Sequence, residues 1–362
     1  MSLPKPQPGI LDIAPYQGGE SVIKGVDRVI KLSSNESALG PSPRAVEAYT
    51  KVAGQLHRYP DGGSTKLREA IGARHGLDPD RIVCGAGSDE LIGLLVRAYC
   101  GHGDEVLYPE HGFLMYSIYA KGCGAVPVRA PERNLTADID AVLAAVTERT
   151  KIVFITNPNN PTGTYTRAEE LVRLRQALPE NVLLVVDAAY AEFVDRNDYS
   201  DGRDLVDSTP NTVMLRTFSK IHGLGGARVG WGYFPVAVAD VMNRLRSPFN
   251  VALPSQEAAA AAIADAEFTA LAKAHNDYWL PWMIEGLRGL GLEVTDSVGN
   301  FVLVRFEPGA KSVEAANAFL MQRGIIARRV AGYGLPDWLR ITIGREDENP
   351  VVLDTIRDFL AQ

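Results

Sequence analysis

The chain has 362 residues, of which 46% are hydrophobic and 22% charged, and its formal net charge is −7. These proportions are ordinary for a folded protein, and the length predicts one large domain with a smaller one. The acidic balance argues against a nucleic-acid-binding protein, whose surface would be basic.

The sequence carries no signal of secretion or membrane insertion. Its three cysteines, Cys84, Cys100 and Cys123, are odd in number and lack the spacing of a metal site, which predicts reduced thiols and no bound metal. Residues 1–10 contain three prolines and no apolar run, so we expect no signal peptide. No apolar stretch approaches the roughly 20 residues of a membrane span. We therefore expect a soluble, cytoplasmic protein that binds neither membrane nor nucleic acid.

The first residues have the pattern of an arm. Residues 29–32 form a short apolar alternation, and Gly40-Pro41-Ser42-Pro43 marks a turn into a helix. Pro43 suits the first helical position after a Ser42 cap. Residues 58–63 are predicted to form a loop, and residues 66–75 a helix.

Strands and helices then alternate between residues 80 and 235. We expect strands at 81–84, 104–108, 125–129, 151–156, 181–186, 212–216 and 229–234. Helices are expected at 91–99, 137–146 and 167–178, with another ending at 119. This alternation predicts an α/β domain in which helices flank both faces of a mostly parallel, seven-stranded sheet.

The remainder predicts a smaller α/β domain. Residues 254–290 read as a long helical stretch that is broken or kinked near Pro281. Strands follow at 300–306, 325–329 and 339–343, and helices at 313–323 and 351–361. With the hinge near 285–295, we predict an N-terminal arm at 1–45 that joins the small domain, a large domain at 46–285 and a small domain at 286–362.

Polar residues stand at the ends of several predicted strands. Gly85-Ala86-Gly87-Ser88 leads into a helix, and such a turn offers free N–H groups to a phosphate. The alternative is a simple N-cap by Ser88. Asp187 ends a strongly apolar strand, where a buried carboxylate needs a cationic partner. Because ligands bind at the carboxyl ends of strands in open α/β sheets, we expect these groups to converge at one rim.

Lys220 lies between hydroxyl residues and a glycine-rich segment, and Arg228 follows eight residues later. A lysine amine forms a Schiff base with a carbonyl, which is how pyridoxal phosphate is held in many enzymes. Arg228 could bind a phosphate in a bidentate fork. The alternative is an exposed Ser-Lys pair beside a flexible loop, and the polar groups at the other strand ends favour the cofactor.

Together these motifs resemble the fold type I pyridoxal-phosphate aminotransferases, in their class II subfamily. The resemblance is carried by Asn160-Pro161-Thr162-Gly163, Asp187-x-x-Tyr190, Ser219-Lys220 and Arg228, in this order. Within that group the chain looks like the histidinol-phosphate aminotransferase family. The segments that carry this are Ala14-Pro15-Tyr16, Lys31-Leu32-Ser33-Ser34-Asn35-Glu36, Arg58-Tyr59-Pro60-Asp61-Gly62, Gly87-Ser88-Asp89-Glu90 and Asn300-Phe301.

The resemblance implies a role for each cofactor-binding residue. Lys220 would be the catalytic residue, which binds pyridoxal phosphate as a Schiff base and then shuttles a proton. Asp187 would pair with the ring nitrogen, while Asn160 and Tyr190 would hydrogen-bond the ring's phenolic oxygen. In an implied homodimer, the phosphate would be surrounded or supported by Ser88, Asp89, Thr217, Ser219, Arg228 and the partner subunit's Tyr59.

One position departs from the family pattern. The family has an aromatic residue that stacks on the cofactor ring shortly before a Met-Tyr pair, and here an extra residue precedes Met115-Tyr116. Phe113 is the best match, and His111 is the alternative.

The implied reaction is transamination of histidinol phosphate with 2-oxoglutarate, in histidine biosynthesis. One pocket must then accept a phosphate and a carboxylate in turn, and arginine fits both anions. We expect Arg340 to be the shared anchor and Arg328 its helper, with Tyr16 and Asn35 closing over the substrate; Arg329 is the candidate for a merely solvated charge. Alternatives are an aromatic amino-acid aminotransferase, dual activity, a pyridoxal-phosphate decarboxylase and a non-catalytic regulator.

Overall fold

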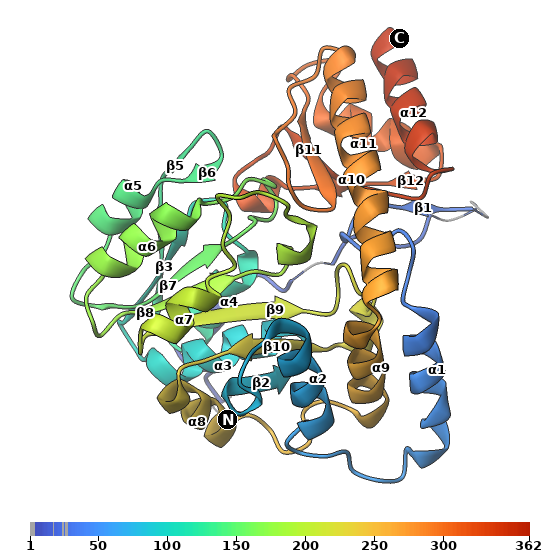
Figure 1. Ribbon diagram of the computed structural model, residues 1–362. Helices are drawn as coiled ribbons and strands as arrows, with labels where there is room; N and C mark the ends of the chain where they lie inside the picture. Colours follow the sequence, from blue (N-terminus) through green and yellow to red (C-terminus); the bar gives the residue numbers. More distant parts are fainter. Residues whose placement is uncertain (1–3, 17, 24, 26–27) are drawn as a thin grey trace.

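A seven-stranded sheet organises the larger part of the molecule (Figure 1). The computed structural model describes residues 4–16, 18–23, 25 and 28–362. In the sheet order β2-β10-β9-β8-β7-β3-β4, β10 is antiparallel to both its neighbours and every other pair is parallel. The mostly parallel, seven-stranded sheet is therefore confirmed. Its strands are β2 (Ile82–Gly85), β3 (Glu105–Pro109), β4 (Val126–Ala130), β7 (Thr150–Thr156), β8 (Leu183–Asp187), β9 (Thr212–Thr217) and β10 (Gly230–Tyr233).

The sheet is buried on both faces because its strands are apolar at successive positions. In β8, Leu184 and Val186 enter one hydrophobic core while Leu183 and Val185 enter the other. The first core is completed by α2 (Thr65–His75), α5 (Ile139–Ala144), α6 (Ala168–Ala177), α7 (Arg203–Ser208) and α9 (Leu253–Ala264). The second is completed by α3 (Ser88–Tyr99), α4 (Leu114–Gly122) and α8 (Val236–Leu245). Each fully buried aliphatic side chain contributes about 1.5–3 kcal/mol.

Three local features differ from the sequence prediction. Helices α7 and α8 stand where no helix was expected. A hairpin, β5 (Glu132–Arg133) with β6 (Thr136–Ala137), turns through two left-handed residues, Asn134 at φ 50° and Leu135 at φ 57°. A leucine in that conformation is uncommon, so the sequence carried no ordinary turn signal there.

The long helical stretch is broken at Asp265 rather than near Pro281, so the predicted break was wrong. Helix α10 (Ala266–Gly289) continues through Pro281. Asp265 ends α9 and caps α10, since its carboxylate accepts from Phe268 N at 3.3 Å and from the Ser42 hydroxyl. The first half of α10 packs through Ala272 into a cluster with Tyr190 and Ile221. Its second half, from Leu280 to Leu287, enters the core of the smaller lobe.

The smaller lobe is built on an antiparallel sheet, β11-β14-β13, under two helices. The predicted strand at 325–329 is two short pieces in different sheets: β12 pairs in parallel with β1, so the N-terminal segment joins this lobe. The predicted division into 1–45, 46–285 and 286–362 stays a prediction. The elements are β1 (Ile30–Lys31), β11 (Phe301–Arg305), α11 (Val313–Gln322), β12 (Ile325–Ile326), β13 (Arg328–Arg329), β14 (Trp338–Thr342) and α12 (Asn349–Ala361).

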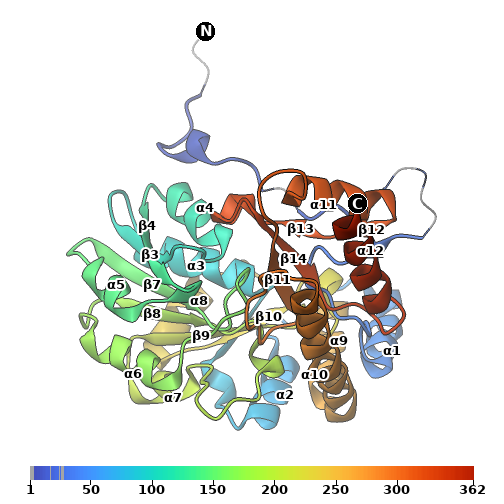
Figure 2. The same cartoon turned by 90° about the horizontal axis from the view of Figure 1, so that it is seen from above.

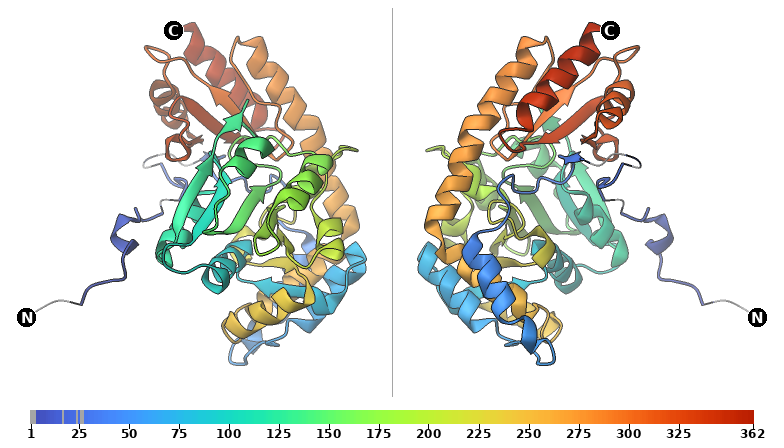
Figure 3. Two further views of the ribbon diagram at one scale, coloured as in Figure 1. Left: turned by 90° about the vertical axis from the view of Figure 1, so that its left-hand side faces the viewer. Right: turned by 90° about the vertical axis from the view of Figure 1, so that its right-hand side faces the viewer.

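Residues 4–16 project from the body of the molecule toward the N-terminus (Figures 2 and 3). A short 3-10 helix in this segment, η1 (Ile10–Asp12), contacts α4 through a hydrogen bond from Lys121 Nζ to Asp12 O at 3.3 Å. Helix α1 (Pro43–Lys51) then packs along α9. Among the described residues, no helix combines the length and apolar character needed to cross a lipid bilayer.

Replacing Asp265 with Ala is expected to lower the free energy of unfolding by about 1–2 kcal/mol, the usual loss for an N-cap. Urea denaturation measures this. The control is Asp277→Ala on the same helix, which removes a surface pair with Lys273 at 2.6 Å and should cost less than about 0.5 kcal/mol. Equal losses in the two variants would contradict the capping role.

Candidate active site

The polar residues at the strand ends meet where the two lobes face each other. Asp187 is the last residue of β8, and Lys220 follows β9 by three residues. The two are close enough for the lysine charge to favour ionisation of the carboxyl. Segment 33–36 and β14 of the smaller lobe cover this rim, since Lys220 Nζ donates to Ser34 O at 3.2 Å.

Asp187 is a buried carboxylate that the chain satisfies on one side only. Its Oδ2 accepts a hydrogen bond from the Tyr116 hydroxyl at 2.8 Å. Its Oδ1 is buried and has no hydrogen-bond partner among the described residues. Burial raises the pKa of Asp187 to about 6, against the opposing effect of the Tyr116 bond. An unpaired buried carboxylate oxygen is suited to a cationic N–H donor of a ligand.

Tyr116 is the main site residue to which the sequence analysis gave no role. Its ring stacks on Phe154 at 4.2 Å, and its oxygen also contacts Thr156 Oγ1 at 2.8 Å. Burial raises the pKa of this phenol well above its usual value, so it remains a donor. The signal was present in the sequence, since Tyr116 and Tyr119 share one face of α4 at helical spacing.

An anion cradle lies at the start of α3. The helix is capped by Gly87, at φ +86°, and Ser88 is its first residue, so the alternative of a Ser88 N-cap was wrong. The positive φ at position 87 favours glycine, and a Cβ there would have to displace the guanidinium of Arg228. Arg228 Nη1 donates to Gly225 O at 3.1 Å and Ser219 Oγ at 3.4 Å. The free N–H groups of the helix start therefore lie beside a guanidinium.

The remaining cradle residues differ in what they offer. The Thr217 hydroxyl donates to Ser219 Oγ at 3.0 Å, and the same oxygen accepts from Arg228 Nη1. Asp89 is held by the Tyr119 hydroxyl at 2.8 Å, and burial raises its pKa. A carboxylate repels a phosphate, so Asp89 can serve this cradle only through its backbone N–H.

Arg340 is a buried cation whose charge the protein leaves uncompensated. It lies on β14 and is only 6% exposed. Nη2 donates to Ser33 O at 2.7 Å, Nη1 donates to the amide oxygen of Asn160, and Nε has no hydrogen-bond partner within the described part of the chain. Among the described residues, no carboxylate forms an ion pair with it. Burial lowers the pKa of Arg340, although it stays cationic near neutrality.

Tyr190 and Asn35 form a fixed link between the lobes. Asn35 Nδ2 donates to the Tyr190 hydroxyl at 2.9 Å, and Thr342 of β14 bonds both the backbone N–H and the side chain of Asn35. Lys220 Nζ lies 5.5 Å from the centre of the Tyr190 ring. Since Asn35 is fully buried in this arrangement, its direct contact with a substrate stays a prediction.

The structure separates the two candidate ring-stacking residues. His111 is buried with its Nδ1 2.7 Å from Tyr333 O, in the smaller lobe. Phe113 packs edge-on against Tyr116, with 5.9 Å between ring centres, and Tyr116 bonds Asp187. These contacts favour Phe113 as the residue near a ring bound at Asp187.

The remaining predicted residues lie on the periphery. Tyr16 and Arg328 line a cavity of about 410 Å³ with Lys121 and Arg129. Arg328 stands opposite Arg340 in the β13–β14 register. Arg329 lies at the surface, where it forms an ion pair with Glu314, in keeping with the alternative of a solvated charge.

Within one chain, Tyr59 does not contact the residues of the candidate active site described above. It is 82% exposed and stacks on Phe249 with 4.6 Å between ring centres. Among the described residues, no group of three or more His, Cys, Asp or Glu side chains could hold a metal ion.

Comparisons with known proteins agree with this geometry. The family model described as "Aminotransferase class I and II" matches residues 27–356. The chain therefore belongs to the class I and II aminotransferases. It is 60% identical over 361 residues to the histidinol-phosphate aminotransferase of Paramagnetospirillum magneticum, which covers 99% of both chains. It is 60% identical over 360 residues to that of Rhodospirillum rubrum, covering 99% of this chain and 98% of the relative. Within the class, its family is that of the histidinol-phosphate aminotransferases.

A solved structure shares the architecture. The histidinol-phosphate aminotransferase from Sinorhizobium meliloti, in complex with pyridoxal-5′-phosphate, superposes with a TM-score of 0.86 at 30% identity and covers 92% of each chain. This agreement confirms the fold type I architecture that the sequence motifs predicted.

Asp187→Asn is expected to stabilise the cofactor-free protein at alkaline pH. The folded-state pKa of Asp187, about 6, lies above the reference value of 3.8, so the folded state binds this proton more tightly. That contribution to stability is present below about pH 4 and is lost as pH rises through 6. At about pH 8 the variant should therefore exceed the wild type by about 2–3 kcal/mol, and the difference should vanish near pH 4.

Urea denaturation of the cofactor-free proteins at the two pH values measures this difference. The control is Asp204→Asn, an exposed carboxylate on α7, with an expected change below about 0.5 kcal/mol at either pH. A stability difference for Asp187→Asn that is independent of pH would contradict the assignment of a buried, proton-binding carboxyl.

Proposed function

We propose that this protein transfers the amino group of histidinol phosphate to 2-oxoglutarate, with pyridoxal phosphate held at Lys220. The products are imidazole-acetol phosphate and glutamate, and the reaction belongs to histidine biosynthesis. The observation that carries the proposal is the uncompensated buried charge of Arg340 beside Lys220, Asp187 and Asn160, in a chain whose curated relatives bear this activity's name.

The residues of the site fit pyridoxal phosphate at three points. The unpaired Asp187 Oδ1 would accept from the ring nitrogen, and Arg228, Ser219, Thr217 and the α3 start would hold the phosphate. Asn160 and Tyr190 would bond the phenolic oxygen, with Phe113 against the ring. When bound, the cofactor supplies an aldehyde that captures amines and a ring that withdraws electrons from the amine's carbon.

The protein's own groups then control the proton. Lys220 Nζ, released once a substrate amine has taken its place, would remove a proton from the substrate's reacting carbon and return it to the cofactor side. Asp187 must be ionised to hold the ring nitrogen's proton, and a cationic N–H at its free oxygen lowers its pKa from the cofactor-free value. Asn35 and Ser34, packed over this site, exclude water on the side of the smaller lobe.

Arg340 would anchor both substrates. Its Nε is unpaired and its two Nη groups bond neutral oxygens, so a phosphate or carboxylate gains a full charge interaction without displacing another anion. Arg328 lies opposite it on β13 and would help to bind the anion, while Tyr16 would lie over the imidazole from the N-terminal segment.

Arg340→Gln is expected to lower kcat/KM by about a hundredfold or more for both histidinol phosphate and 2-oxoglutarate, because it removes a buried charge contact. Steady-state kinetics with each substrate varied in turn measure this. Arg329→Gln is the matched control, since that arginine pairs with Glu314 at the surface, and its kcat/KM should stay within about twofold. A loss confined to one substrate would argue against a shared anchor.

The same assay separates the proposal from an aromatic amino-acid aminotransferase. We expect histidinol phosphate to exceed phenylalanine in kcat/KM with 2-oxoglutarate as acceptor, because phenylalanine has no phosphate. A phenylalanine value as high as that of histidinol phosphate would instead support the aromatic activity.

We further propose that the enzyme is a cytoplasmic homodimer in which the partner subunit's Tyr59 completes the phosphate cradle. Tyr59 is 82% exposed and stacks on the exposed Phe249, and a second copy would cover these two rings. The free thiols Cys84, Cys100 and Cys123 suit a reducing compartment.

Mixing two inactive variants tests this shared site. Lys220→Ala abolishes activity, and Tyr59→Ala should weaken cofactor retention and rate. If Tyr59 serves the opposite subunit, refolding the two together yields hybrids with one intact site, and about a quarter of the wild-type sites return. Activity no greater than the sum of the separate variants would contradict a shared site.

A further inference from the structure

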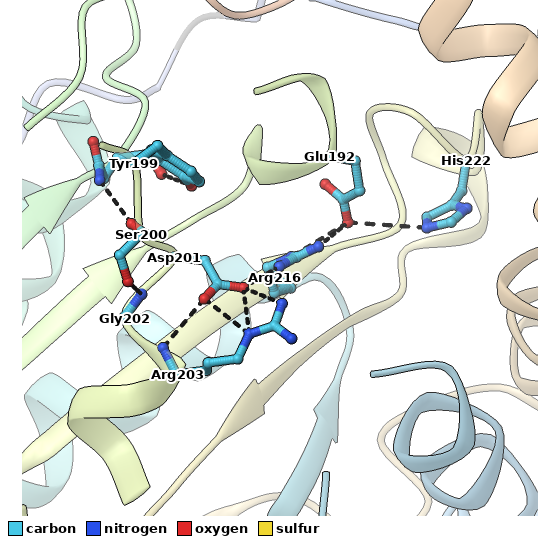
Figure 4. Close-up of polar contacts among 9 residues, drawn as sticks. Glu192, Tyr199, Ser200, Asp201, Gly202, Arg203, Arg216 and His222 are labelled. Atoms are coloured by element: carbon cyan, nitrogen blue, oxygen red, sulfur yellow. Dashed lines mark hydrogen bonds and ion pairs between the residues drawn. The ribbon is translucent and has the colours of Figure 1, made fainter. Parts of the chain in front are cut away.

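Four charged side chains, Glu192, Arg216, Asp201 and Arg203, form a chain of charges joined by ion pairs (Figure 4). Arg216 of β9 bridges two carboxylates: Nη2 and Nε donate to Glu192 Oε1 at 2.8 and 3.2 Å, and Nη1 donates to Asp201 Oδ2 at 2.7 Å. Arg203 of α7 closes the outer end on Asp201, with Nη2 to Oδ2 at 2.8 Å. Two cations therefore balance two anions.

The Arg216–Glu192 pair is linked to the site by its position in the sequence. Glu192 lies in the 3-10 turn η4 (Ala191–Phe193), two residues after Tyr190. Arg216 stands four residues before Lys220, and His222 two residues after it. The His222 Nε2 is 4.0 Å from the same Glu192 oxygen that Arg216 bonds. One carboxylate thus contacts both sides of the turn that carries Lys220.

Burial restrains the Arg216–Glu192 ion pair. The Arg216 and Glu192 side chains are 4% and 11% exposed, and Glu192 Oε2 has no hydrogen-bond partner among the described residues. Arg216 also lies over the Trp231 ring, with 5.7 Å from its guanidinium carbon to the ring centre. Charges removed from water interact strongly and tolerate little displacement, because a separated partner is left uncompensated.

We propose that the Arg216–Glu192 pair is a positioning device that sets Lys220 and Tyr190 relative to each other. It rests on the proposed function, in which Lys220 binds the cofactor and Tyr190 hydrogen-bonds its phenolic oxygen. The pair holds the turn after β9 and the turn after β8 in one geometry, including the 5.5 Å separation of Lys220 Nζ from the Tyr190 ring. Neither Arg216 nor Glu192 needs to touch cofactor or substrate.

Glu192→Gln tests this, since it keeps the side chain's shape and removes its charge. The readout is the absorbance of the reconstituted holoenzyme, whose visible band titrates with pH according to the hydrogen bonds on the phenolic oxygen. We expect the titration midpoint to move by about half a unit or more, and kcat for histidinol phosphate to fall about tenfold or more. KM should change less than about threefold, because the anion anchor is untouched.

Arg203→Gln is the matched control. It also removes one charge, but from the Arg203–Asp201 ion pair at the start of α7 rather than from the Arg216–Glu192 pair. A merely structural role predicts lower thermal midpoints for both variants and unchanged titrations. If Glu192→Gln does not fold, Arg216→Lys keeps the charge but cannot bridge both carboxylates, and the same shift is expected.

The outcomes distinguish the two proposals. A wild-type protein that takes up no pyridoxal phosphate would overturn the proposed function and this inference together. A wild-type band that titrates, with Glu192→Gln moving it no more than Arg203→Gln does, would overturn the positioning role alone.

Discussion

Two buried charges of opposite sign, Asp187 and Arg340, lie at the junction of the lobes, and each keeps one polar atom without a hydrogen-bond partner among the described residues. Burying such groups is costly, so a protein that retains them depends on a ligand to complete them. Asp187 lies at the end of β8 in the large sheet, and Arg340 lies at the centre of β14 in the smaller one. The architecture brings both groups to the same junction as Lys220, where Lys220 Nζ donates to Ser34 O and Arg340 Nη2 donates to Ser33 O.

The same logic explains why the site is assembled from so many parts of the sequence. Parallel strands deliver their carboxyl ends to one rim, so β8 and β9 bring in Asp187 and Lys220 without any local signal connecting them. Segment 33–36 reaches the rim because β1 pairs with β12, which commits the N-terminal segment to the smaller lobe. Residues 307 apart along the chain, Asn35 and Thr342, then share hydrogen bonds.

Much of this was predictable because apolar periodicity and strand-end chemistry are local. The seven strands of the large sheet lie within a few residues of the ranges that the sequence predicts, and residue chemistry alone marks Lys220, Asp187 and Arg340 as candidates. What failed depended on tertiary context. Pro281 was tolerated because packing from both lobes supports α10, whereas the break fell at Asp265, where Ser42 completes the cap. The Arg216–Glu192 pair was missed because no spacing rule joins residues on two strand-end turns.

Helix α10 has a mechanical consequence. Its first residue is fixed beside α9 by the Asp265 cap, and Leu280 to Leu287 lie in the small-lobe core, so a single rod connects the bodies that carry Asp187 and Arg340. The helix has 24 residues and is therefore about 36 Å long. A tilt of about 5° at its origin would move its far end by about 3 Å, comparable to a hydrogen-bond length. The contact between Arg340 and Asn160 therefore depends on the angle at which α10 leaves the Asp265 cap.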